Sequence, residues 1–186
     1  AGGPEVSYDS RETLGRLPEL TGVMKGEGEK TFAKLCKVYG KRSETSELSL
    51  EQIDGITFRC PDGTICERPW RVPMDLSEVP FVYHDMKKFE NKIIYYETSR
   101  GCPFSCSYCL SSIDKRLRFR SLDLVFNELQ FFLDHKVPQV KFVDRTFNCK
   151  HDHAMAIWKY IQEHDNGITN FHFEVAADLL NDEEIR

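Results

Sequence analysis

The second half of the chain alternates short apolar runs with longer amphipathic stretches. Three apolar runs, at 93–98, 139–143 and 171–176, have the length and composition of strands. The stretches after the first two runs repeat apolar residues every three or four positions, as helices do, and Ser121 is a suitable N-cap for the first of them. Strands that alternate with helices of this length are typical of parallel βα units. The sequence therefore predicts an α/β fold with three such units between 92 and 186.

The first 40 residues carry a shorter version of the same pattern. Residues 23–25 end a predicted strand, a glycine-containing turn follows at 26–29, and apolar residues at helical spacing predict a helix over 31–39. A Gly-Gly-Pro turn at 2–4, with no initiator Met before it, is typical of the end of an earlier strand, so we expect the chain to be cut from a longer one. The turn at 26–29 is either a helix entry with acidic residues at the positive end of the helix dipole or, like the turn at 2–4, the carboxyl end of a parallel strand, where doubly wound sheets bind cofactors.

The connection between the two halves is punctuated by turns. Residues 41–49 are polar and rich in Ser and Glu, which predicts a surface loop. Two short β-prone runs, 53–59 and 64–67, flank a Pro-Asp-Gly turn at 61–63 and predict a β-hairpin. We expect this connection to have a structural role.

Three of the seven cysteines are grouped on the segment that follows the strand at 93–98. Segment 100–109 reads R-G-C-P-F-S-C-S-Y-C, so Cys102, Cys106 and Cys109 are four and three positions apart. Thiols grouped on a loop oxidise or bind metal, which indicates a metal centre. Three thiols without a fourth ligand nearby favour an iron–sulfur cluster with one iron left open.

Two other interpretations of the cysteine loop remain. Structural zinc prefers paired C-x-x-C units and four ligands, and only one such unit occurs here. The grouping could also be fortuitous. The scattered cysteines are interpreted as small apolar residues: Cys36, Cys60, Cys66 and Cys149.

The pattern C-x-x-x-C-x-aromatic-C, formed by Cys102, Cys106, Tyr108 and Cys109 after a strand, resembles the signature of the radical S-adenosylmethionine superfamily. The resemblance implies a 4Fe-4S cluster on the three cysteines, with S-adenosylmethionine chelating the fourth iron. It implies reductive cleavage of S-adenosylmethionine to methionine and a 5'-deoxyadenosyl radical. It further implies an external electron donor of the flavodoxin or ferredoxin type and a small-molecule substrate of unknown identity. Tyr108 would shield the cluster from water, with the adjacent backbone against the adenine.

Two acidic residues near the ends of the next two strands are candidates for contacting S-adenosylmethionine. Asp144 lies where many members of the superfamily carry a G-G-E-like segment, which this sequence does not match; its alternative role is a local ion pair or helix cap. Glu174 shares one face of the third strand with His172 and resembles the acidic residue that contacts S-adenosylmethionine in relatives. Its alternative is a buried salt bridge, with Lys141 or Arg145 as partner.

Two arginines, Arg118 and Arg120, come shortly after the cysteine loop. They could order the loop or meet an acidic partner. Equally, they could form a solvated basic face.

The order of the two glycine turns and the cysteine loop resembles cobalamin-binding radical S-adenosylmethionine proteins, in which a Rossmann-like cobalamin domain precedes the radical domain. On this resemblance, 1–40 is the carboxyl-terminal part of a cobalamin-binding-like Rossmann domain. A linker with a β-hairpin spans 41–91, and 92–186 forms the amino-terminal half of a TIM-like barrel. Cobalamin is then a further expected cofactor, and the expected reaction is cobalamin-dependent methyl transfer or oxidoreduction. The D-x-H-x-x-G motif with which some relatives ligate cobalt does not occur in the chain.

Two rival functions follow from the same residues. The first is a non-catalytic module whose cysteines hold zinc or an iron–sulfur cluster without S-adenosylmethionine. The second, within enzymes, is a methylthiotransferase, but those proteins carry a separate cysteine-bearing amino-terminal cluster domain that the segment before the loop does not support.

Charge and composition narrow the expected partners. The chain has 25 basic and 30 acidic side chains, a formal charge of −5, which argues against electrostatic binding of nucleic acid. No apolar run approaches a membrane span, so we expect a cytoplasmic protein in a reducing interior. Half a barrel leaves a strand edge uncovered, so we also expect self-association and no substrate turnover by this chain alone.

Overall fold

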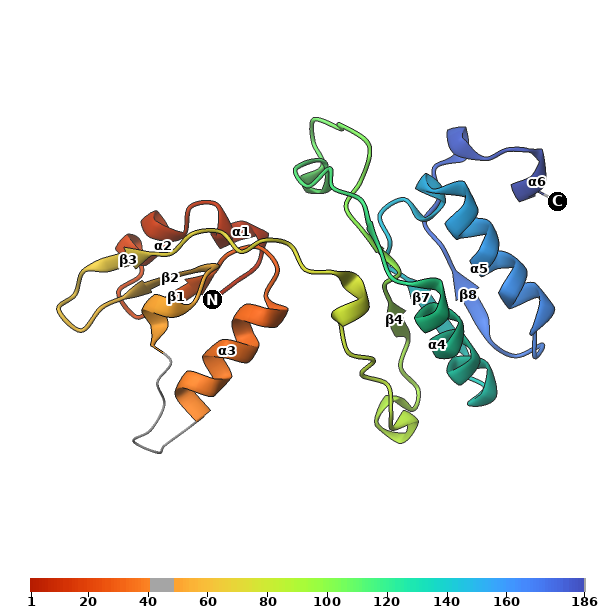
Figure 1. Ribbon diagram of the computed structural model, residues 1–186, viewed down its shortest axis with the longest axis horizontal. Coiled ribbons are helices and arrows are strands. Elements are labelled where there is room, and N and C mark those ends of the chain that lie inside the picture. The colour runs from red at the N-terminus through yellow and green to blue at the C-terminus, as the bar shows by residue number, and fades with distance from the viewer. Residues whose placement is uncertain (41–48, 186) are drawn as a thin grey trace. The chain divides into compact units, whose positions relative to one another are not determined.

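The computed structural model describes residues 1–40 and 49–185. The chain divides into two compact units, Ala1–Pro73 and Met74–Arg186, and each has its own sheet (Figure 1). The predicted polar loop at 41–49 lies, apart from its last residue, outside the described residues. In the part of the chain that the structure describes, no helix is long and apolar enough to cross a membrane.

The first unit is built on an antiparallel sheet with the strand order β1-β2-β3. The strands are β1 (Gly22–Met24), β2 (Ile56–Arg59) and β3 (Ile65–Glu67). The helices are α1 (Pro4–Ser7), α2 (Ser10–Arg16) and α3 (Glu29–Gly40). The predicted helix and hairpin are confirmed, but the hairpin pairs with β1, Gly22 opposite Phe58, and so belongs to the first unit. β2 pairs with β1 along one edge; on the other edge Ala1 donates to the carbonyl of Gly22 (2.9 Å) and accepts from the N–H of Met24 (2.8 Å), the pattern of a parallel pairing. A full Rossmann-like segment stays a prediction.

A buried lysine ties the end of β1 to β3. Lys25 is 2% exposed, and its Nζ donates hydrogen bonds to Glu67 Oε1 (2.8 Å) and to the carbonyl of Arg68 (2.7 Å). The ammonium also lies 5.3 Å from the centre of the Trp70 ring. A buried charge needs such partners, so these contacts hold the glycine turn at 26–29 in place. An apolar cluster of Ile53, Ile56 and Phe58 forms the core beside them.

The second unit contains the predicted parallel βα units. Its main sheet has the strand order β4-β7-β8, and both pairings are parallel. The strands are β4 (Ile94–Tyr96), β7 (Gln139–Phe142) and β8 (Asn170–His172). The helices are α4 (Leu122–Asp134), α5 (His151–Glu163) and α6 (Asp182–Ile185). The predicted cap at Ser121 is confirmed, since its Oγ accepts from the backbone N–H of Leu124.

One face of this parallel sheet is covered and the other is open. Buried residues of α4 and α5 join those of the strands in one apolar cluster that includes Leu129, Phe132 and Ile157. On the other face Tyr95, Lys141 and His172 share one register, and Tyr95 is 56% exposed. The open face is the one on which His172 and Glu174 were expected, although β8 ends at His172 rather than at 176. Closure of this sheet into a barrel stays a prediction.

Candidate functional site

The cysteine loop, residues 101–117, leaves and rejoins the second unit through a small antiparallel ribbon. Strands β5 (Ser99–Arg100) and β6 (Arg118–Phe119) pair with each other directly after β4, at its carboxyl end. Gly101 has φ +101°, and a Cβ at this position would collide with the carbonyl of Arg116. The glycine before the first cysteine is therefore required where the two arms of the loop come close together.

The three cysteines occupy different environments on this loop. Cys102 is buried, its backbone N–H donates to the carbonyl of Asp114 (3.2 Å), and its Sγ lies 3.6 Å from Thr146 Oγ1. Cys106 is exposed and Cys109 is half-buried, and the N–H of Cys109 donates to the carbonyl of Cys106 (3.2 Å). All three thiols are free. The first cysteine is thus anchored in the fold, while the other two lie on the outer part of the loop.

The chemistry of these donors fits an iron–sulfur cluster, but the loop does not bring them together. Hydrogen bonds from the backbone and hydroxyl of Ser111 lower the pKa of the Cys109 thiol, and Arg145 adds to the effect. A lowered pKa favours the thiolate, which is the form that binds metal. However, among the residues that the structure describes, no three His, Cys, Asp or Glu side chains are grouped closely enough to hold a metal ion. The ligand set of Cys102, Cys106 and Cys109 therefore stays a prediction.

Tyr108 extends into solvent. Its side chain is 92% exposed, the highest value among the exposed large apolar residues. In this conformation the ring shields none of the three thiols from water. Its predicted contact with a cluster or with S-adenosylmethionine stays untested.

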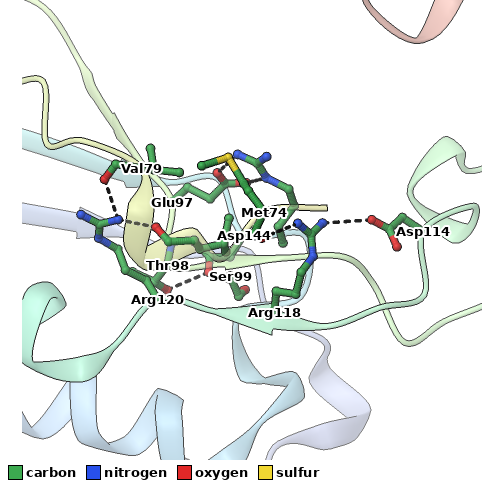
Figure 2. A network of polar contacts seen from close by, with 11 residues as sticks. Met74, Val79, Glu97, Thr98, Ser99, Asp114, Arg118, Arg120 and Asp144 are labelled. Carbon is green, nitrogen blue, oxygen red and sulfur yellow. Dashed lines mark hydrogen bonds and ion pairs between the residues drawn. The ribbon is translucent and has the colours of Figure 1, made fainter. Parts of the chain in front are cut away.

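Asp144 is buried and its carboxylate is fully engaged. It is 1% exposed; Oδ1 accepts from Thr98 Oγ1 (2.7 Å) and Ser99 Oγ (2.5 Å), and Oδ2 accepts from the N–H of Thr98 (3.1 Å) (Figure 2). Burial raises the pKa of Asp144, and the bonds from Ser99 and Thr98 oppose that rise. The carboxylate therefore fixes the chain just before the cysteine loop. Its predicted contact with S-adenosylmethionine stays untested, and the geometry shows a positioning role.

Glu174 forms the ion pair that was its alternative role. Its Oε1 lies 3.5 Å from Lys141 Nζ, and the two side chains are 46% and 35% exposed. The pair is therefore half-exposed rather than buried, and such pairs contribute little to stability. Glu174 remains accessible on the open side of the sheet, so its predicted contact with S-adenosylmethionine stays a prediction.

A buried ion pair that the sequence interpretation missed lies beside Asp144. Arg120 Nη2 and Nε donate to Glu128 Oε1 (2.5 Å) and Oε2 (2.9 Å), and the Tyr96 hydroxyl donates to Glu128 Oε2 (2.5 Å). Burial raises the pKa of Tyr96, so its phenol stays protonated and can donate. The sequence did carry a signal for this pair: Glu128 is an acidic residue on the apolar face of α4, next to Leu129 and one turn after Val125.

The two arginines therefore have acidic partners and do not form a solvated face. Arg120 Nη1 also donates to the carbonyls of Leu76 (2.5 Å) and Val79 (2.9 Å), and its backbone N–H donates to the carbonyl of Thr98 (2.8 Å). Arg118 pairs with Asp114 Oδ2 (3.0 Å) on the returning arm of the loop (Figure 2). We call Thr98, Ser99, Arg120, Glu128 and Asp144 the buried polar network. It links β5 and α4 to the short segments that follow β4, β6 and β7, at the base of the cysteine loop.

Comparison of the sequence with known proteins identifies longer relatives. No protein-family model matches the chain. It is 30% identical over 165 residues to a protein of Pyrococcus horikoshii described as an uncharacterized methyltransferase, a match that covers 84% of this chain and 35% of the relative. It is 30% identical over 114 residues to the anaerobic magnesium-protoporphyrin IX monomethyl ester cyclase of Synechocystis, which covers 58% of this chain and 22% of the relative. The chain thus spans about a third or less of the length of these relatives.

Comparison of the fold identifies two enzymes of known structure. OxsB, a cobalamin-dependent S-adenosylmethionine radical enzyme solved with aqua-cobalamin, matches with a TM-score of 0.72 and 24% identity over 95% of this chain and 26% of its own. TsrM of Kitasatospora setae, a radical S-adenosylmethionine methyltransferase solved with cobalamin and a 4Fe-4S cluster, matches with a TM-score of 0.59 and 18% identity over 89% of this chain and 34% of its own. At these identities the likeness concerns the fold. Together with the cysteine signature and the sequence relatives, it identifies the chain as a member of the radical S-adenosylmethionine superfamily.

Proposed function

We propose that this chain is the part of a radical S-adenosylmethionine enzyme that holds a 4Fe-4S cluster through Cys102, Cys106 and Cys109. The observation that carries the proposal is the presence of three free thiols on one loop at the carboxyl end of β4. This is the end of a parallel sheet at which α/β proteins place their working residues. When bound, the cluster supplies the electron that reductive cleavage of S-adenosylmethionine requires, and a flavodoxin or ferredoxin type of protein is the proposed source of that electron.

The buried polar network holds the base of the loop in place for this task. Asp144 accepts from the backbone N–H of Thr98 and the hydroxyl of Ser99, and the backbone N–H of Arg120 donates to the carbonyl of Thr98. Cys102 lies three residues further on and is itself buried against Thr146. One ligand is therefore fixed before metal binds, and the outer part of the loop supplies the other two by rearranging. Ligands held by locked neighbours bind with less loss of entropy.

We propose cobalamin-dependent methyl transfer as the reaction class of the enzyme to which this chain belongs, with a small molecule as substrate. Two observations support this choice. The Pyrococcus relative and TsrM are both described as methyltransferases. The OxsB structure that matches 95% of this chain, and therefore both units, contains aqua-cobalamin. Oxidoreduction without methyl transfer is the alternative outcome.

Anaerobic reconstitution with ferrous iron and sulfide tests the cluster. The chain should bind about four irons and four sulfides and become brown. Cys106→Ala should lose most of the iron, whereas Cys36→Ala, an exposed cysteine on α3, should keep it. Stoichiometric zinc with no iron, or a full cluster in Cys106→Ala, would contradict the proposal.

Two further measurements separate the parts of the proposal. Formation of 5'-deoxyadenosine from S-adenosylmethionine, with dithionite or reduced flavodoxin as donor, distinguishes a radical enzyme from a non-catalytic iron–sulfur module. Retention of hydroxocobalamin after dialysis, measured on the longer enzyme to which this chain belongs, tests the cobalamin assignment. If that enzyme binds iron but retains no cobalamin, the methyl-transfer class loses its support while the cluster assignment stands.

A further inference from the structure

Two cysteines of the first unit, which are not part of the cysteine loop, lie side by side on the β2–β3 hairpin. Cys66 lies in β3 opposite Phe58, and Cys60 directly follows β2. The backbone N–H of Cys60 donates to the carbonyl of Thr64 (2.8 Å), so the strand pairing continues as far as Cys60. Cys60 and Cys66 are then diagonal neighbours on one face of the hairpin. Their Sγ atoms are 2.8 Å apart, and both thiols are free.

The turn between the two cysteines holds them in this arrangement. Asp62 Oδ1 accepts from both the N–H (2.9 Å) and the hydroxyl (2.7 Å) of Thr64. Gly63 has φ +86° and its N–H donates to the carbonyl of Cys60 (2.9 Å). β2 is paired with β1 on its other side. The two sulfur atoms are therefore brought together by backbone geometry rather than by two mobile side chains.

The surroundings of the pair favour a disulfide over a metal site. Cys60 and Cys66 are half-buried against the apolar cluster of Ile53, Ile56 and Phe58, yet remain accessible to a small reagent. A closed zinc site takes four ligands, and within the described ranges no third His, Cys, Asp or Glu joins these two thiols. A disulfide requires only the two sulfurs, and its S–S bond is about 2.05 Å long.

We propose that Cys60 and Cys66 form a reversible disulfide, with a low-molecular-weight disulfide as the oxidant. One cysteine thiolate attacks the small disulfide, forms a mixed disulfide and releases one small thiolate. The neighbouring cysteine thiolate attacks the sulfur of the mixed disulfide that belongs to the protein, forms the Cys60–Cys66 bond and releases the second small thiolate. The two cysteines lose two electrons and two protons in total, and two small thiols are formed. The cross-linked hairpin stays paired to β1, and the cysteines of the loop take no part.

The charge around the pair predicts how the reaction depends on pH. The hydrogen bond with Cys60 raises the pKa of the Cys66 thiol, and the carboxylates of Glu51 and Asp62 act in the same direction. Only the thiolate attacks a disulfide. Cross-linking should therefore be faster at pH 8.5 than at pH 7.

Peptide mapping tests the proposal directly. The reduced full chain is equilibrated anaerobically with mixtures of reduced and oxidised glutathione, alkylated with N-ethylmaleimide and digested with trypsin. Trypsin does not cleave after Arg68, because a proline follows it. Residues 60–71 therefore form one peptide, which contains both cysteines of the pair and no other cysteine. This peptide should become lighter by two hydrogen atoms and carry no alkyl group, in mixtures in which Cys36 is still fully alkylated.

Single substitutions provide the controls. Cys66→Ser should leave Cys60 either alkylated or bound to glutathione, and Cys36→Ser should leave the cross-link unchanged. The proposal is overturned if Cys60 and Cys66 are alkylated to the same extent as Cys36 in every mixture. It is also overturned if each accumulates its own glutathione, or if either is linked to a cysteine of the loop.

Discussion

The cysteine loop and the buried polar network beneath it differ sharply in how firmly they are held. Tyr108 on the loop is 92% exposed, and Cys106 is exposed as well. By contrast, Asp144 is 1% exposed, and the side chains of Arg120 and Glu128 are 7% and 8% exposed. Two residues expected to carry chemistry, Cys106 and Tyr108, thus lie outside the core, whereas the charged residues of the network, among them the cofactor candidate Asp144, lie inside it.

This difference separates two requirements of a metal-binding loop. The ligands must be able to rearrange, because the three thiols do not converge in this conformation of the loop. The base of the loop must stay in place, because the position of the cluster relative to the sheet depends on it. Substitutions in the network should therefore change the stability of the second unit, and substitutions on the outer loop should not.

The fluorescence of Trp158, which packs against Phe147 and Phe173, reports on the folding of this unit once Trp70 is replaced by Phe.

The largest loss of stability is expected for Arg120→Met. This change leaves the carboxylate of Glu128 buried, with only the Tyr96 hydroxyl as donor, and breaking one side of a buried ion pair costs about 3–5 kcal/mol. Urea unfolding followed by Trp158 fluorescence measures the free energy of unfolding. The double variant Arg120→Met/Glu128→Leu should be less destabilised than Arg120→Met alone. If it is destabilised by the sum of the two single effects, the residues are not coupled.

A pH-dependent loss of stability is expected from a buried histidine near the base of the cysteine loop. His153 of α5 is 4% exposed and lies 5.0 Å from the ring of Phe119 in β6; burial lowers its pKa from 6.5 to about 4. Between these two values the unfolded chain binds more protons than the folded one, so stability falls as the pH falls through this window. The difference in pKa corresponds to at most about 3 kcal/mol.

The histidine contribution is isolated by comparing variants across pH. The free energy of unfolding of the wild type, minus that of His153→Leu, should decrease as the pH falls from 7.5 to 4, because only the wild type carries the histidine. His172→Gln, at an exposed position on β8, serves as the control and should follow the wild type. A difference that does not vary with pH would show that His153 is not held neutral in the fold.

A smaller loss is expected for Asp144→Asn. The amide keeps the shape of the carboxylate but replaces one acceptor oxygen with a donor, which faces the donors of Thr98 or Ser99. Leaving buried donors without a partner costs about 1–3 kcal/mol. The same variant should bind iron less tightly after reconstitution, because Asp144 fixes the base of the loop. Unchanged stability together with lost binding of S-adenosylmethionine would instead support the direct cofactor contact.

The smallest effect is expected for Tyr108→Ala. A ring that is 92% exposed contributes little to folding, and the free energy of unfolding should change by no more than about 0.5 kcal/mol. In the reconstituted protein the variant should lose cluster iron to oxygen faster than the wild type, as expected for a shielding residue. A large loss of stability in the protein before reconstitution would contradict the expectation that outer-loop substitutions leave the stability of the second unit unchanged.

The features that the sequence predicted are those that depend on local order along the chain. The alternation of apolar runs with helical periodicity identified the parallel βα units, and Ser121 was identified as a cap by its position before the first helix. The hairpin followed from its Pro-Asp-Gly turn, and the cysteine loop from its spacing after a strand. None of these requires knowledge of which distant residues meet.

The tertiary structure decided the partners of polar side chains. Asp144 was interpreted from its place after a strand, but its oxygens bind Thr98 and Ser99, which lie 46 and 45 positions earlier in the chain. Cys60 and Cys66 were interpreted as unrelated small residues until the hairpin register placed their sulfurs together. β1 gained an antiparallel partner from beyond α3. Periodicity and spacing report which face of an element is buried, whereas the partner of a buried polar group depends on which elements pack against that face.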